Sequence, residues 1–210
     1  SGKVIMNIGD GVSARYYNPG DKVPANYQLL LTFKDESFLV FTVAMYGFIS
    51  AYPDGVIDNK YYTISRESIS PLSDAYTEAE FEKLFAFAKK TLTAKALLAT
   101  EQRIPGVGNG VTQDILFNAG IHPKQKVFDL SDGQKGVLFK SLKDTLMAMT
   151  SGRGRDTQTD LYGNEGGYKT ILSSKTWKNP CPRCGSVIVK EAYLGGSVYY
   201  CSECQKIRKT

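Results

Sequence analysis

The stretch CPRCGSVIVKEAYLGGSVYYCSEC, residues 181–204, decides the architecture at the end of this 210-residue chain. It holds all four cysteines of the sequence as two C-x-x-C pairs, with sixteen residues between the pairs. Each such pair offers two thiolates on one side of a turn, and two such turns close a tetrahedral zinc site. We therefore expect one structural zinc ion, with an iron centre or disulfides as the alternatives. The expected ligands are Cys181, Cys184, Cys201 and Cys204.

The residues between the two cysteine pairs predict a β-hairpin that turns at Gly195–Gly196. The positive charge of the chain gathers around this hairpin. Residues 151–210 contain ten Lys and Arg against five Asp and Glu, which accounts for the whole formal net charge of +5. Such a charge permits a polyanionic partner without identifying one.

The composition excludes several classes of protein. With 42% hydrophobic residues the chain can bury a core, and no apolar run approaches the roughly 18 residues that a membrane span needs. No signal peptide opens the sequence, so we expect a soluble, intracellular protein. Because the sequence does not begin with Met, we also expect it to start inside a larger protein or after added residues.

The sequence predicts an α+β chain in three parts: a partial β-sandwich segment, a helical domain and a C-terminal β-hairpin zinc ribbon. Residues 4–8, 27–33 and 38–44 are rich in strand formers, whereas residues 51–75 contain turn formers and predict a loop. Apolar residues at helical spacing then predict the helices 77–90, 93–100, 111–119 and one opened by a capping box at Ser131. Residues 152–177 predict irregular structure. The expected domains are a remnant of a β-rich domain (1–75), a helical domain (76–177) and a zinc ribbon (178–210).

The glycine-rich turn PGVGNG, residues 105–110, opens one of these helices. It lacks the Lys-Ser/Thr pair of a P-loop and the fuller glycine pattern of a dinucleotide loop. Two interpretations stay open: a purely structural turn, or a helix N-terminus that binds a phosphate through its free N–H groups. In the same way, Asn109 either caps the helix or extends its amide to a ligand.

The segment GVGNGVTQDILFNAGIHP, residues 106–123, followed by the cysteine hairpin, resembles the formamidopyrimidine-DNA glycosylase/endonuclease VIII family. In that family a helix–two-turns–helix motif and a C-terminal zinc ribbon grip DNA around a damaged base. The resemblance covers residues 77–204 well and the β-rich segment loosely. It implies a structural zinc ion as cofactor and damaged or abasic double-stranded DNA as partner.

The resemblance also implies roles for individual residues. Asn109 matches an asparagine that contacts a backbone phosphate, with Gly108 and Gly110 as flanking backbone donors. Asp114 matches an acidic residue that serves packing and polarity. For His122 we expect a local hydrogen bond in a turn and no catalytic role. The candidate DNA contacts are Gly108, Asn109, Gly110, Arg103, Met45, Tyr46, Gly195 and Gly196.

Three departures from the family pattern concern the chemistry. The family's nucleophile is an N-terminal proline amine, which attacks the sugar and forms a Schiff base. Ser1–Gly2 does not match it and Lys3 does not match the catalytic lysine, so we expect no catalytic residue in this chain. Met45 and Tyr46 stand where the family has a DNA-inserting loop, and they serve either as wedges or as core residues. Gly196 stands where the family's ribbon carries an arginine.

Three functions follow from these patterns. The leading hypothesis is a DNA repair glycosylase/AP lyase, or its DNA-gripping portion, in which case these residues alone would be inactive. The first alternative is a non-catalytic zinc-ribbon DNA-binding protein of the same fold. The second is a zinc ribbon that serves RNA or protein partners.

Overall fold

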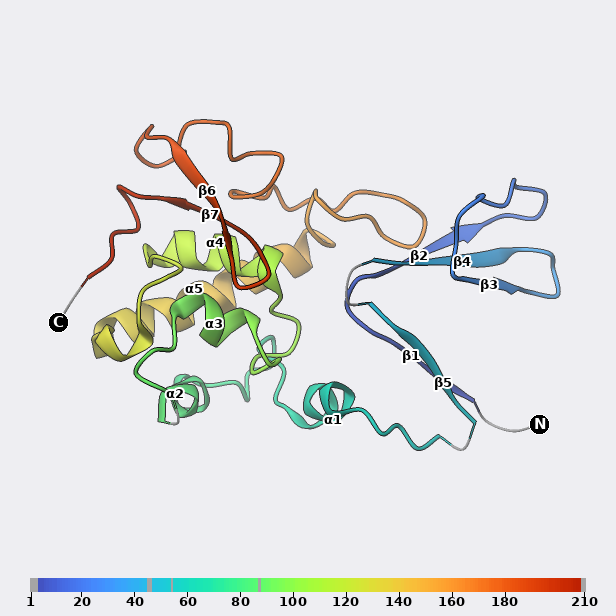
Figure 1. Cartoon of the computed structure of the whole chain (residues 1–210), viewed down its shortest axis with the longest axis horizontal. Helices are drawn as coiled ribbons and strands as arrows, with labels where there is room; N and C mark the ends of the chain where they lie inside the picture. The colour runs from blue at the N-terminus through green and yellow to red at the C-terminus, as the bar shows by residue number, and fades with distance from the viewer. Residues whose placement is uncertain (1–3, 45–46, 54, 87, 209–210) are drawn as a thin grey trace. The chain divides into compact units, whose positions relative to one another are not determined.

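The computed structural model describes residues 4–44, 47–53, 55–86 and 88–208. The chain divides into two compact units, one of residues 1–62 and 158–165, the other of residues 63–157 and 166–210. Figure 1 labels the helices and strands, which run in chain order as β1 Ile5–Ile8, β2 Val12–Tyr17, β3 Leu29–Thr32, β4 Phe38–Val43, β5 Ile49–Tyr52, α1 Lys60–Glu67, α2 Glu78–Ala86, α3 Ala94–Ala99, α4 Asn109–Ala119, the 3-10 turn η1 Val127–Asp129, α5 Asp132–Ser151, β6 Ile188–Tyr193 and β7 Gly196–Cys201. The α+β class predicted from the sequence is confirmed.

The first unit is built from two small antiparallel sheets. β4 lies at the centre of the order β2-β4-β3, and β1 pairs with β5 so that Ile5 lies opposite Tyr52. The segment 158–165 belongs to the same unit, because the backbone N–H of Tyr16 donates to the carbonyl of Leu161 at 2.8 Å. The ring of Tyr162 packs edge-on against Tyr16, with 5.5 Å between centroids.

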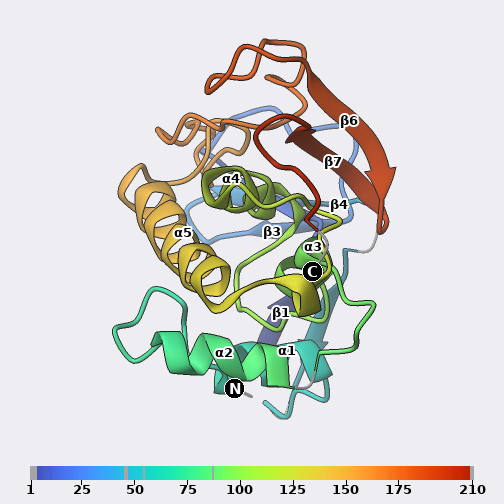
Figure 2. The same ribbon diagram turned by 90° about the vertical axis from the view of Figure 1, so that its left-hand side faces the viewer.

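The second unit packs its helices around a continuous apolar core. Figure 2 shows α4 between the long helix α5 and strand β7 of the hairpin. The core side chains come from α2 through α5 and the turns between them, and the fully buried ones include Phe81, Leu97, Leu98, Ile115, Leu116, Leu138 and Leu142. A second cluster joins the far end of α4 to the ribbon through Phe117, Leu172, Ile188 and Tyr199. Among the described residues, no helix has both the length and the apolar character needed to cross a lipid bilayer.

The helix ends follow local capping rules. Ser131 accepts a hydrogen bond from the backbone N–H of Gln134 and completes the predicted capping box at the start of α5. Gly120 ends α4 in the left-handed region at φ 66°, as predicted for a C-cap. Helix α4 begins at Asn109, two residues before the predicted start, because Gly108 rather than a later residue is its N-cap.

Other predictions were wrong in detail. Residues 51–75 were expected to form a loop, but they contain α1, whose first turn is held by the Asn59 side chain accepting from the N–H groups of Tyr61 and Tyr62. At eight residues, α1 is shorter than the window of about 11–18 residues in which hydrophobic periodicity is read. Strands β2 and β5 were not predicted. The helix expected over residues 77–90 ends at Ala86.

Candidate metal centre and nucleic-acid interface

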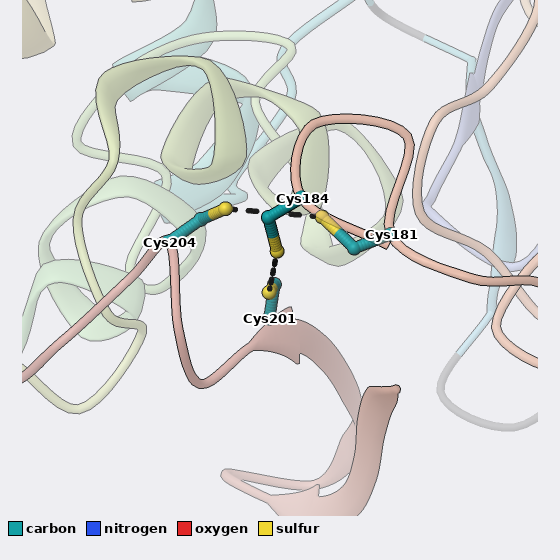
Figure 3. Close-up of side chains that lie close together, drawn as sticks. All are labelled: Cys181, Cys184, Cys201 and Cys204. Carbon is teal, nitrogen blue, oxygen red and sulfur yellow. Dashed lines mark hydrogen bonds between the residues drawn. The ribbon is translucent and has the colours of Figure 1, made fainter. Parts of the chain in front are cut away.

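The four cysteines lie together at the base of the hairpin. Cys181 and Cys184 come from the turn before β6, and Cys201 and Cys204 from the end of β7 and the turn after it; Figure 3 shows their sulfur atoms pointing toward one another. All four Sγ atoms lie within 4.8 Å of one another, and none is in a disulfide. The closest approaches are 3.5 Å between Cys184 and Cys201 and 3.8 Å between Cys181 and Cys204.

This geometry fits a zinc ion. Tetrahedral Zn–S bonds of about 2.3 Å place neighbouring sulfur atoms about 3.8 Å apart. Hydrogen bonds from Ser186 lower the pKa of Cys184 to about 6, whereas burial raises the pKa of Cys204 to about 12. A bound cation removes that burial cost, because it stabilises the thiolate directly. The predicted four-cysteine zinc site, and with it zinc as the structural cofactor, is confirmed.

The hairpin turns one residue earlier than predicted. Leu194 and Gly195 form its two-residue loop, with φ of 50° and 73°, and Gly196 already belongs to β7, opposite Tyr193. Two successive positive φ values define the turn type that suits the twist of a two-stranded ribbon. The prediction of a Gly195–Gly196 turn was wrong because the non-glycine Leu194 adopts the left-handed conformation.

The first turns of α4 are fastened to strand β7. The Nδ2 of Asn109 donates to the carbonyl oxygen of Ser197 at 3.1 Å, and the Nε2 of Gln113 donates to the same oxygen at 3.0 Å. The Oε1 of Gln113 accepts from the backbone N–H of Tyr199 at 3.1 Å. Gln113 therefore supplies β7 with one donor and one acceptor, as a neighbouring strand would. Its place one helical turn after Asn109 was the only sequence signal for this role.

At Gly196, where the resemblance leads one to expect an arginine, there is little room for a side chain. A Cβ built on Gly196 would lie 3.2 Å from the Nδ2 of Asn109, closer than ordinary van der Waals contact. Glycine at this position lets the helix and the hairpin approach closely enough for the Asn109–Ser197 hydrogen bond. Two predicted DNA contacts, Asn109 and Gly196, are therefore neighbours in the structure.

Other predicted site residues lie elsewhere. The Arg103 guanidinium donates to the carbonyl oxygens of Ala96 and Thr100, at 3.0 and 3.2 Å, and to the Glu101 carboxylate at 2.7 Å. The Arg103 side chain thus provides hydrogen-bond donors for the free carbonyl groups at the C-terminal end of α3. Met45 and Tyr46 lie outside the described residues. Gly108 and Gly110 lie at the start of α4, as predicted.

Further contacts fix the hairpin to the helical body. The buried Lys95 donates its Nζ to the carbonyl of Tyr193, and Lys124 forms an ion pair with Glu191 at 2.7 Å. The ring of His122 packs against Tyr200 with 4.3 Å between centroids. The Nδ1 of His122 accepts from the N–H of Lys124, which is the local bond expected for a turn residue, and burial lowers the pKa of His122.

Asp114 organises the segment that leads into the ribbon. Its carboxylate is fully buried and accepts from the backbone N–H groups of Ile171 at 3.0 Å and Leu172 at 2.8 Å. Burial raises the pKa of Asp114, and these hydrogen bonds oppose that shift. The contacts agree with the packing and polar role expected from the sequence.

Comparison with known proteins finds similarity in both sequence and fold. No family model matches the sequence. The formamidopyrimidine-DNA glycosylase of Carboxydothermus hydrogenoformans is 31% identical over 139 residues, which are 65% of this chain and 52% of that protein. The protein of the same name from Shouchella clausii is 27% identical over 193 residues, covering 90% of this chain and 69% of its own length. The chain thus spans about half to two thirds of these relatives.

Solved structures show the same fold. A complex of the Lactococcus lactis Fpg with DNA containing an abasic site aligns with a TM-score of 0.76 and 22% identity, over 97% of this chain and 74% of that chain. The MutM (Fpg) protein of Thermus thermophilus also aligns with a TM-score of 0.76 and 22% identity, over 98% of this chain and 77% of its own. At this identity the structural likeness shows the fold alone.

Proposed function

The chain belongs to the formamidopyrimidine-DNA glycosylase family, and on this premise we propose that it is the DNA-gripping portion of a base-excision-repair glycosylase/AP lyase. Its substrate is double-stranded DNA with a damaged base or an abasic site, bound through backbone phosphates. The observation that carries the proposal is the junction of α4 with the zinc hairpin, where Asn109 lies against Gly196.

The junction suits a phosphate for two chemical reasons. The first turn of α4 has N–H groups without helical partners and a partial positive charge. The amide of Asn109 has two N–H donors, and its hydrogen bond to Ser197 uses one of them. Asn109 is exposed, so the second donor is available to a phosphate oxygen. The zinc ion, which folds the hairpin, supplies structure rather than chemistry in this proposal.

The chemistry of the family depends on an amine nucleophile. A secondary amine must attack the sugar C1′ of an extruded nucleotide and expel the base. No residue of this chain matches that amine, so we expect residues 1–210 by themselves to bind DNA without forming the Schiff base. We further propose that the protein works as a monomer at the bacterial nucleoid, in the cytoplasm.

A binding experiment with the zinc-loaded chain tests the proposal. We expect tighter binding to a duplex with an abasic site than to the intact duplex, and a steep fall in affinity between about 50 and 200 mM salt. Asn109→Ala should weaken binding to the abasic duplex. The matched control is Asn118→Ala, at the far end of the same helix, where the amide donates to Thr145 at 3.0 Å. Equal affinity for the two duplexes, or no salt dependence, contradicts the proposal.

A non-catalytic DNA-binding protein is the second candidate, and Gly196 in place of the ribbon arginine is the observation that favours it. Borohydride treatment of a protein–DNA mixture traps a Schiff base as a covalent adduct. If the full-length protein binds abasic DNA but yields no covalent adduct, it is a non-catalytic DNA-binding protein. If an adduct forms, the protein is an enzyme.

A further inference from the structure

Arg155 lies directly over the start of α4. A Cβ built on Gly110 would lie 2.4 Å from its Nη1, 2.8 Å from its Nη2 and 2.9 Å from its Cζ. The guanidinium thus occupies the space of the side chain that Gly110 lacks. Because Gly110 directly follows Asn109, this places the charge of Arg155 in the same helical turn as the proposed phosphate contact.

The backbone that carries Arg155 is held in place. Arg155 forms a parallel bridge with Tyr168, in which Asp156 N donates to Tyr168 O at 2.9 Å and Tyr168 N donates to Gly154 O at 3.0 Å. Arg155 belongs to residues 152–177, for which the sequence predicts irregular structure. Within this segment the bridge holds the backbone of Arg155 in place.

Within the parts of the chain that the structure describes, 4–44, 47–53, 55–86 and 88–208, the guanidinium makes no hydrogen bond or ion pair, although the charges of Asp114 and Asp156 attract it. The two nearby carboxylates are engaged by other donors. Asp114 accepts from Ile171 and Leu172, and Asp156 accepts from both the N–H and the hydroxyl of Thr170. A half-buried cation with unused donors is costly beside the positive end of a helix, and an anion at that place would relieve both charges.

We propose that Arg155 is a DNA-contacting residue that grips a backbone phosphate at the first turn of α4. It supplies the guanidinium that position 196 lacks, from a different segment of the chain. This inference rests on the proposed function, since the phosphate belongs to the DNA that the junction of α4 and the hairpin binds. The competing explanation is structural: Arg155 does no more than balance the buried charge of Asp114.

Matched charge removals separate the two explanations. We expect Arg155→Gln to weaken binding to an abasic duplex about tenfold and to reduce the slope of log affinity against log salt by about one, as for the loss of one phosphate contact. The control is Arg153→Gln, an exposed arginine two residues earlier, which should change affinity by no more than about twofold because exposed charges are screened. Arg155→Lys keeps the positive charge but loses the paired N–H donors of the guanidinium. The slope of log affinity against log salt should therefore stay unchanged, while the affinity falls severalfold.

Gly110→Ala gives an independent readout with Arg155 present. The new methyl group displaces only the end of a flexible side chain, so the protein should fold and yet lose affinity as Arg155→Gln does. In the double variant the two losses should not add, since both remove the same contact.

Two results overturn the inference. In the first, Arg155→Gln retains wild-type affinity and salt slope while the wild type still prefers the abasic duplex; the proposed function then stands without Arg155. In the second, Arg155→Gln lowers the melting temperature measured by circular dichroism and leaves the salt slope unchanged, as the structural explanation requires. A wild type without preference for the abasic duplex refutes the proposed function itself.

Discussion

The β-rich unit and the helical unit with its ribbon differ in how many of their apolar side chains are buried. In the β-rich unit the buried apolar residues of the described chain are Phe38, Val40 and Phe41, all on β4, while Met6 and Ile8 on β1 are exposed. The helical unit buries apolar side chains from each of α2 to α5 and adds polar contacts between distant segments. A segment with its own core can hold residues from far apart in the sequence at fixed distances. The predicted phosphate contacts at positions 108–110 and 196 all lie in that unit.

Removing zinc should have the largest effect and would show how far the ribbon depends on its metal. The free energy of structural zinc binding is about 10–16 kcal/mol in zinc-finger peptides, and the hairpin is too small to fold without it. We expect a chelator, or Cys201→Ser, to unfold β6 and β7 and abolish DNA binding while α5 remains helical. Hydrogen exchange read by mass spectrometry follows both segments, with zinc re-addition as the control. Hairpin amides that stay protected without zinc would contradict this prediction.

A cavity in the helical core should have the next largest effect and tests whether the two units unfold separately. Leu142 on α5 is fully buried, and Leu142→Ala should lower the free energy of unfolding of the helical unit by about 2–5 kcal/mol. Urea denaturation measures the loss. In hydrogen exchange the amides of β4 should keep their protection, because β4 belongs to the other unit. Equal loss of protection in β4 and α4 would show that the units unfold as one.

The smallest effect is expected from the ion pair that fastens the hairpin. The hydrogen bond from Lys124 holds the pKa of Glu191 below its usual value. A carboxylate with a lowered pKa adds stability above its unfolded-state pKa and loses it as the pH falls through the folded-state value. At pH 7 the melting temperature of the wild type should therefore be higher than that of Glu191→Gln. The two melting temperatures should converge as the pH falls toward about 3. A constant difference across this range would assign the effect to packing instead.

Local patterns predicted the parts of this protein that short-range chemistry determines. The spacing of the cysteines predicted the metal cluster, because each C-x-x-C turn places two sulfur atoms on one side and the hairpin between the pairs brings the two turns together. The capping box at Ser131 and the left-handed Gly120 depend on neighbours within one helical turn. Strand β4 was predicted from its β-branched and aromatic residues. Helix α1 escaped prediction because its eight residues are too few for hydrophobic periodicity to be read.

The sequence by itself thus determined the cysteine cluster, most helices with their caps, and the family resemblance that pointed to DNA. Only the tertiary structure decided which residues meet at the start of α4: Gln113 bonds to Ser197 and Tyr199 across 84 and 86 residues, and Asn109 packs against Gly196. It also brought Arg155 onto Gly110. Contacts over such separations depend on how α4, the ribbon and the segment after α5 pack together, and no local spacing encodes that packing.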